Sequence, residues 1–274
     1  MTGEPTVRAG IDRDWLAHAV RVEPVLHALA AWDVAWEPER VRVYSCGPER
    51  SPQGYLLIWL GEPAHPVVHW VGDPRITRAL AEYLPPRPLT VGGSAECVAI
   101  VEAARGPVRW SLIDRLIARP TAEVPGSGDP RVRIVGAEDA PSIRDWAAHH
   151  EDAFVQGYAQ FQFDPERRFV WAAWDGSRPI GIAFASVRLP EVWVLNGIFV
   201  EECARGQGLG RALTAFGMEA ARRAGAPAAL NVREENLGAR RVYDRLGFES
   251  VDRIAWIEAA EPPTVPRTRE SDDR

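Results

Sequence analysis

The segment V-E-E-C-A-R-G-Q-G-L-G-R, residues 200–211, joins an apolar run to an amphipathic stretch and holds three closely spaced glycines. Residues 191–200 are typical of a buried strand, and apolar side chains recur at helical steps over 208–224. Glycines at such a strand–loop–helix junction let backbone N–H groups approach a ligand, and the helix N-terminus adds partial positive charge. The segment therefore predicts a pyrophosphate site. A turn that needs glycine only for packing is the alternative.

Two other phosphate-binding loops do not fit this spacing. A Walker loop requires Gly-Lys-Ser/Thr, and the chain contains no lysine. A Rossmann dinucleotide site requires Gly-x-Gly-x-x-Gly near the first strand and an acidic residue about 20 positions later. Here the glycines are Gly206, Gly208 and Gly210, and they follow several predicted strands. Neither of these two loop types is therefore expected.

A second motif, N-L-G-A-R-R-V-Y-D-R-L-G-F, covers residues 236–248. In a helix, Asn236, Arg240 and Tyr243 stand at positions i, i+4 and i+7 on one face, and the first and last lie about 10 Å apart along the axis. A polar stripe that ends in a phenol is unusual on a helix that also buries apolar residues, so it indicates a binding face. The alternative is a helix-capping Asn and a Tyr at the edge of the core.

Charge is distributed unevenly along the chain. Residues 203–248 carry eight arginines against four acidic residues, although the net charge of the whole chain is −6. A basic zone in an acidic protein favours a small bound polyanion; arginines on solvated helix faces are the alternative. The negative net charge argues against a nucleic-acid partner.

Together, the glycine loop and the helix motif that follows about 26 residues later resemble the GCN5-related N-acetyltransferases (GNAT), over about residues 131–257. The resemblance implies acetyl-CoA, or another acyl-CoA, as the donor and an amine as the acceptor, with no metal. It implies that Tyr243 is catalytic, because its hydroxyl would bond the coenzyme sulfur and protonate the leaving thiolate. The residues that it implies for coenzyme binding are Ile198, Phe199, Val200, Arg205, Gly206, Gln207, Gly208, Leu209, Gly210, Arg211, Asn236, Arg240 and Tyr243.

The acceptor side of the site departs from the family pattern. The resemblance places a β-bulge on the strand over 192–200, with Gly197 as the candidate bulge residue. Histone-acetylating members carry a glutamate base on this strand, and Val194 occupies that position here. A base on this strand is therefore not expected. The candidate acceptor-binding residues are Asn196 and the cluster His149, His150, Glu151 and Asp152, for which a solvated surface cluster is the alternative.

Composition places the chain among globular proteins. Of its 274 residues, 46% are hydrophobic and 26% are charged, and no apolar run approaches the roughly 20 residues of a membrane-spanning helix. The N-terminus lacks the apolar core of a secretory signal. Cys46, Cys97 and Cys203 match neither a disulfide framework nor a metal-binding spacing, which predicts a cytoplasmic protein. Cys203 lies beside the donor loop, but no histidine is near it in sequence and direct transfer needs no thiol, so we expect a structural role for it. Arginine as the sole basic residue type besides histidine is typical of a GC-rich bacterial genome.

Two stretches predict domain boundaries. A-R-P-T-A-E-V-P-G-S-G-D-P-R, residues 118–131, predicts a linker over 120–130, and residues 261–274 predict a disordered tail. A GNAT acetyltransferase domain is then expected over 131–260, after an N-terminal α/β domain over 1–119. The N-terminal block weakly resembles a degenerate acetyltransferase half. It lacks both motifs, so no donor site is expected there.

The expected fold class is α/β, with a mixed twisted sheet and helices on both faces, preceded by a smaller α/β domain. In the second block we expect strands over 131–135, 168–174, 179–188, 191–200, 228–232 and 248–257, and helices over 141–150, 208–224 and 236–246. In the first block we expect strands over 55–60, 67–71 and 89–91 and a helix over 75–84.

The function expected from these patterns is transfer of the acetyl group of acetyl-CoA to an amine by direct attack. The alternative is a non-catalytic acyl-CoA-binding sensor or interaction module. The missing base favours the alternative, whereas Tyr243 favours the enzyme. The amine acceptor is a small molecule or a peptide, and its identity, the acyl-chain preference and the oligomeric state stay open.

Overall fold

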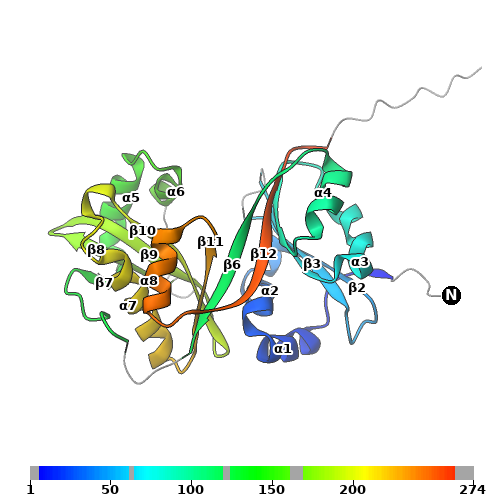
Figure 1. Cartoon of the computed structure of the whole chain (residues 1–274), viewed down its shortest axis with the longest axis horizontal. Helices are drawn as coiled ribbons and strands as arrows, with labels where there is room; N and C mark the ends of the chain where they lie inside the picture. The colour runs from blue at the N-terminus through cyan, green and yellow to red at the C-terminus, as the bar shows by residue number, and fades with distance from the viewer. Residues whose placement is uncertain (1–5, 62–64, 120–123, 161–168, 263–274) are drawn as a thin grey trace, which may run out of the picture. The chain divides into compact units, whose positions relative to one another are not determined.

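The computed structural model describes residues 6–61, 65–119, 124–160 and 169–262 (Figure 1). Contacts within the chain divide it into two compact units that alternate along the sequence. The first unit comprises Met1–Asp12, Glu39–Ser111 and Ile254–Arg274, and the second comprises Arg13–Pro38 and Leu112–Arg253. No helix within the described ranges is long and apolar enough to cross a membrane.

The predicted domains run in chain order, whereas the two compact units alternate along the chain. The division into 1–119 and 131–260 therefore stays a prediction. Within the predicted linker, residues 120–123 lie outside the described residues. The same holds for 263–274 of the predicted tail.

The second unit, which includes residues 112–118 of β6 (Arg109–Ala118), is built on a mixed sheet. The strand order is β6, β11 (Ala228–Arg233), β10 (Val192–Val200), β9 (Arg178–Leu189), β8 (Phe169–Asp175) and β7 (Val132–Ile134). Only the pair β10–β11 is parallel among these neighbours, and the other pairs are antiparallel. Apart from β6, each strand lies within two residues of its predicted bounds. The expectation of a mixed α/β sheet is confirmed.

Helices cover both faces of this sheet, as the alternation along β8 shows. Trp171 and Ala173 pack in the cluster that contains α7 (Leu209–Arg223) and α8 (Leu237–Arg245). Val170 and Ala172 point the other way, into the cluster that contains α5 (Ala140–Ala148). A short helix, α6 (Ala153–Gln156), follows α5.

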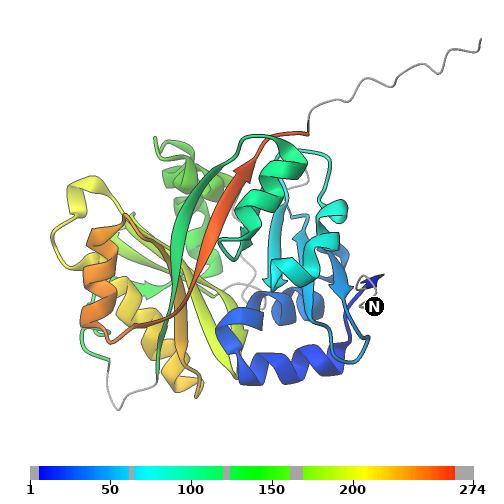
Figure 2. The ribbon, with the colours of Figure 1, turned by 45° about the vertical axis from the view of Figure 1, so that its right-hand side comes forward.

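The N-terminal helices α1 (Arg13–Val22) and α2 (Pro24–Trp36) belong to the second unit (Figure 2). Helix α2 lies beside β9 and β10, and α1 packs on α2. Ala28 and Trp32 of α2 pack against Val192 and Val194. The sequence analysis did not identify either helix. In α2 apolar residues surround most of the helix, so its sequence shows little amphipathic periodicity.

The strand next to β11 corrects the sequence-based expectation. Residues 248–257 were expected to close the sheet of the second block, but residues 113–118 of β6 pair antiparallel with β11 instead. The segment R-W-S-L-I-D-R-L-I-A of β6 has charged residues in its middle, which hide its strand character. The C-terminal strand β12 (Glu249–Ala259) pairs over 255–259 with β5 (Leu89–Gly93) in the first unit.

The first unit contains β1 (Val7–Ala9), β2 (Val41–Cys46), β3 (Gly54–Trp59), β4 (Val67–Gly72) and β5, hydrogen-bonded in that order. The pair β4–β5 is parallel, and the others are antiparallel. The predicted helix over 75–84 is the short helix α3 (Pro74–Thr77) followed by a 3₁₀ segment, η2 (Arg78–Tyr83). A further helix, α4 (Cys97–Arg105), completes its apolar core.

Candidate functional site

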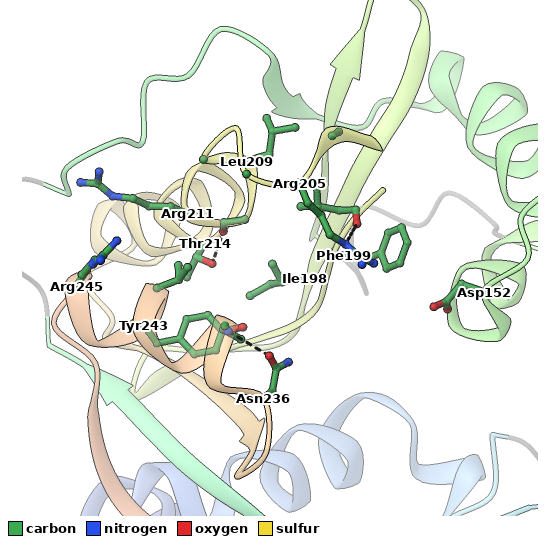
Figure 3. A pocket seen from close by; sticks show the side chains of 18 residues that line it. Asp152, Ile198, Phe199, Arg205, Leu209, Arg211, Thr214, Asn236, Tyr243 and Arg245 are labelled. Carbon is green, nitrogen blue, oxygen red and sulfur yellow. Dashed lines mark hydrogen bonds between the residues drawn. The ribbon is translucent and has the colours of Figure 1, made fainter. Parts of the chain in front are cut away.

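A cavity of about 910 Å³ opens in the second unit between β10, the N-terminal end of α7 and one side of α8 (Figure 3). It brings together residues from both sequence motifs. The lining consists of Asp152, Ile198, Phe199, Val200, Ala204, Arg205, Gly206, Gly208, Leu209, Gly210, Arg211, Thr214, Asn236, Gly238, Ala239, Val242, Tyr243 and Arg245.

A β-bulge at Gly197 shapes the strand side of this cavity. Along β9, Phe184 pairs with Asn196 and Ile182 with Phe199, so two residues of β10 stand opposite one residue of β9. Gly197 has a φ of 63°, a conformation that suits glycine. The predicted bulge is therefore confirmed.

Strands β10 and β11 separate just before this bulge. Their parallel pairing covers only Trp193–Leu195 and Ala228–Leu230, although β10 continues to Val200 and β11 to Arg233. The backbone of Ile198–Val200 consequently faces the cavity on its β11 side with no strand partner there. An extended ligand can occupy that place and hydrogen-bond to the strand.

The glycine loop leaves the N-terminal end of α7 open. Gly208 is the residue that precedes the helix, and no side chain caps the first turn. Gly206 and Gly208 have φ values of 78° and 81°, and a Cβ added at either of them, or at Gly210, would meet nothing within 4 Å. The first N–H groups of α7 thus point toward open space with the positive end of the helix dipole, an arrangement that binds anions.

Charged side chains lie at two ends of the cavity. Arg211 and Arg245 lie on one side and Asp152 lies on the opposite side (Figure 3). Neither guanidinium group forms a hydrogen bond or an ion pair with any residue that the structure describes. By contrast, the guanidinium of Arg222, also on α7, pairs with Glu219. Two arginines whose charges are not neutralised by the described protein favour a bound polyanion.

Asn236, which precedes α8, and Tyr243 on that helix are polar residues of the second motif that reach the cavity, as does Arg245. The Oδ1 atom of Asn236 accepts a hydrogen bond from the N–H of Ala239 at 3.1 Å, so this residue caps the helix and also lines the cavity. Tyr243 is 7% exposed, and burial raises its pKa to about 12. Its hydroxyl is therefore protonated at neutral pH and is able to donate a proton or a hydrogen bond.

Two residues predicted to bind the coenzyme do not line the cavity. The guanidinium of Arg240 pairs with Asp114, a residue of β6. The side chain of Gln207 accepts a hydrogen bond from Arg131 at 3.2 Å and faces a separate hollow beside Gly126 and Asp129. Of the expected polar stripe, Asn236 and Tyr243 thus line the cavity, whereas Arg240 points to Asp114.

The predicted acceptor cluster also divides. Asp152 lines the cavity, and its N–H donates to Nδ1 of His150, whose ring packs edge-on against Phe199 at 5.2 Å. His149 is exposed beside Asp145. His149 and His150 line a second hollow of about 430 Å³, and Glu151 is exposed and lines neither space.

The remaining two positions on β10 face away from the cavity. The side chain of Asn196 donates to Oγ of Ser186 at 2.5 Å and does not line the cavity. Val194 is buried against α2, so no ionisable group stands where the family places its glutamate.

Sequence reasoning missed several lining residues. Thr214 lies one helical turn after Gly210, and its hydroxyl donates to the carbonyl oxygen of Gly210 at 2.8 Å. Arg245 lies inside the second motif, two positions after Tyr243. Helical spacing from Gly210 would have identified Thr214, whereas Arg245 does not have that spacing from Asn236 or Tyr243. The others are Ala204, Gly238, Ala239 and Val242.

Comparison with known proteins gives a consistent family. The acetyltransferase (GNAT) family model matches residues 136–248. The mycothiol acetyltransferase of Mycobacterium avium is 32% identical over 261 residues, which cover 79% of this chain and 82% of that protein. The mycothiol acetyltransferase of Geodermatophilus obscurus is 38% identical over 109 residues, 35% of this chain, and the match spans only 33% of that protein's length.

Solved structures show the same fold at lower identity. A GCN5-related N-acetyltransferase from Sphaerobacter thermophilus superposes with a TM-score of 0.61 at 16% identity, covering 97% of this chain and 98% of that one. A tandem GNAT protein from the clavulanic acid biosynthesis pathway gives 0.58 at 15% identity, covering 96% and 100%.

Proposed function

The chain belongs to the acetyltransferase (GNAT) family and is an acetyl-CoA-dependent N-acetyltransferase, and from that premise we propose that it acetylates a small-molecule amine in the cavity beside β10. One observation carries this proposal. Residues 198–200 of β10, where that strand has separated from β11, line a single cavity together with the open N-terminal end of α7 and with Tyr243.

The coenzyme is assigned to this cavity by the match between its groups and the lining. Its pyrophosphate fits the N–H groups of residues 206–211, and its pantetheine arm fits the unpaired side of Ile198–Val200. Arg205, Arg211 and Arg245 supply positive charge for three phosphate groups. Roles in coenzyme binding for Gln207 and Arg240 find no support in their placement.

The reaction is the direct attack of an uncharged amine nitrogen on the thioester carbonyl carbon. A carbon–nitrogen bond forms, the carbon–sulfur bond breaks, and the nitrogen loses one proton. Backbone N–H groups beyond the bulge at Gly197 are placed to polarise the carbonyl. The Tyr243 hydroxyl donates a proton to the departing sulfur, a modest contribution because an ordinary thiol has a pKa near 8.5.

Asp152 is the acceptor-side residue with the best placement, because it contributes the sole carboxylate among the lining residues. A carboxylate there attracts the ammonium form of the acceptor and can take its proton directly or through water. His150 holds the backbone of Asp152 and packs on Phe199, which gives it a positioning role. His149, Glu151 and Asn196 lie outside this cavity and remain weaker candidates.

The acceptor panel starts from the relatives' names. Two bacterial relatives are called mycothiol acetyltransferases, so acceptors of the mycothiol type are to be assayed first, followed by amino acids, polyamines, aminoglycosides and peptide N-termini. A cytoplasmic location, with no nucleic-acid or membrane partner, is part of this proposal.

Release of free coenzyme A thiol tests the proposal. Incubating the full chain with acetyl-CoA and each amine should give thiol release above the amine-free rate for at least one acceptor. The competing function is a non-catalytic acyl-CoA-binding module. That function predicts a measurable acetyl-CoA affinity with no acceptor-dependent thiol release from any amine.

A further inference from the structure

Glu201 is a buried residue at the point where the chain leaves β10 for the glycine loop. It is 5% exposed, and the strand ends one residue earlier. Its N–H donates to the carbonyl oxygen of Ile180 at 2.9 Å, and its own carbonyl accepts from the N–H of Ala204 at 3.0 Å. The backbone of Glu201 therefore joins the sheet to the turn that leads into Arg205 and Gly206.

The side chain of Glu201 collects donors from three separate elements. Nε1 of Trp146, on α5, donates to Oε1 at 2.6 Å. One terminal nitrogen of Arg178, at the start of β9, lies 2.9 Å from both carboxylate oxygens. The thiol of Cys203, inside the loop, donates to Oε2 at 3.4 Å.

This carboxylate is ionised at neutral pH. Burial alone would raise the pKa of Glu201, but the hydrogen bonds from Trp146 and Cys203 and the charge of Arg178 outweigh that effect and lower it. Hydrogen bonds to an ionised acceptor are stronger than neutral ones, so the contacts fix the loop firmly against α5 and β9.

The contacts of Glu201 connect it to residues that line the cavity in two places, the loop after β10 and Phe199. Ala204 and Arg205 line the cavity, and Nε of Arg205 donates to the carbonyl oxygen of Val200 at 3.2 Å. The ring of Trp146 also packs against Phe199, with centroids 6.2 Å apart. A displacement of Glu201 would therefore move the loop that precedes α7.

We propose that Glu201 is a positioning residue for the phosphate groups of the coenzyme: it holds the loop over 202–208 so that Arg205 and the first N–H groups of α7 converge on one anion. The inference rests on the proposed function, because it assumes that the cavity binds coenzyme A. A purely structural role would affect stability and every ligand alike, whereas a role in positioning the phosphate site affects only ligands that carry phosphates.

The test compares two ligands, coenzyme A and pantetheine, which lacks all three phosphates. Both are titrated into the full chain, coenzyme A by calorimetry and pantetheine by NMR. Glu201→Ala should weaken coenzyme A binding by about 10- to 100-fold, the range expected for lost hydrogen bonds to a charged group. Pantetheine affinity should change by less than about 3-fold, because its backbone contacts lie on β10.

Three further variants make this test specific. Glu201→Gln keeps the shape and one acceptor oxygen but loses the negative charge, so it should weaken coenzyme A binding less than Glu201→Ala does. Glu202→Ala removes the same charge from an exposed neighbour in the same loop and should leave both affinities unchanged. Trp146→Phe keeps an aromatic ring at this position but removes one donor, so it should shift the affinity ratio in the same direction by less. If Glu201→Ala does not fold, Trp146→Phe tests the positioning role of Glu201 in its place.

The outcomes separate the inference from the proposed function. The positioning role is overturned if the ratio of coenzyme A affinity to pantetheine affinity in folded Glu201→Ala and Trp146→Phe equals the wild-type ratio. This holds whether both affinities are unchanged or both are weakened by the same factor. If the wild-type chain does not bind coenzyme A, the proposed function itself is wrong.

Discussion

The guanidinium of Arg240 pairs with the carboxylate of Asp114, which stands 126 positions earlier in the chain. The side chain of Asp114 is 2% exposed and also accepts a hydrogen bond from Nε of Arg253 at 2.8 Å. Because α8 carries Tyr243 as well as Arg240, β6 anchors the helix that bears the proposed catalytic acid. The orientation of Tyr243 thus depends on a residue outside the 136–248 segment that the family model matches.

Replacing Tyr243 with Phe tests the catalytic assignment. The ring and its edge-on packing against Phe248 are kept, while the hydroxyl is lost. Turnover should fall by about 10²–10⁴-fold, as is typical of general acid–base groups. The acetyl-CoA affinity should change little, because the phosphates and the pantetheine arm are bound elsewhere. Steady-state kinetics and a binding titration measure both quantities. Equal turnover in the variant and the wild type would remove the catalytic role.

Bulky substitutions in the glycine loop test the phosphate site. Gly208→Val and Gly210→Val should abolish the rise in melting temperature that acetyl-CoA produces, because the new side chains fill the open space at the N-terminal end of α7. Gly225→Val is the matched control for Gly208→Val, since Gly225 has a similar φ of 77° and does not line the cavity. It should lose stability but keep the ligand-induced shift. Wild-type affinity in both loop variants would contradict the assignment.

Arg245→Gln tests the cationic side of the cavity. The variant should bind acetyl-CoA roughly 10-fold more weakly, since a hydrogen bond to a charged group is lost. Its affinity should also depend less on salt than that of the wild type. Arg241→Gln removes a charge from an exposed position on the same helix that does not line the cavity, so its affinity should stay at the wild-type level. Titrations at two salt concentrations decide between these expectations.

Asp33→Asn tests a buried carboxyl on α2. Burial, together with the neighbouring charge of Glu37, raises the pKa of Asp33 to about 7. Because the carboxyl ionises more readily in the unfolded chain, its contribution to stability falls as pH rises from about 4 to 7. The variant lacks this ionisation and should gain on the order of 4 kcal/mol over the wild type between pH 4 and pH 8. Denaturant unfolding across that pH range measures the difference. Parallel pH profiles for the two proteins would show that Asp33 titrates normally.

Local patterns account for the elements that the sequence predicted well. The expected strand over 191–200 and helix over 208–224 correspond to β10 (Val192–Val200) and α7 (Leu209–Arg223). Apolar periodicity and the glycines at the junction define both of them. The bulge at Gly197 and most of the cavity lining were expected from the family resemblance that the two motifs carry.

Features that depend on distant partners were not predictable. Arg240 has the correct helical spacing for the cavity, but its direction is set by Asp114, whose strand was not expected beside β11. Gln207 turns toward Arg131 for a comparable reason. Glu201 carries no motif signature, because its donors come from Trp146 and Arg178 on elements that meet only in the folded chain.

The pairing of β6 with β11 has a consequence for dissecting this enzyme. A fragment that begins after residue 119 would contain the whole segment that the family model matches, yet the backbone N–H and C=O groups on one side of β11 would lose their partners. A bare strand edge invites pairing with other chains, so such a fragment should aggregate. Gene fusion or recombination at the family boundary would separate the catalytic segment from the strand that completes its sheet. The segment that this acetyltransferase needs in order to fold is accordingly longer than the segment, residues 136–248, that the family model matches.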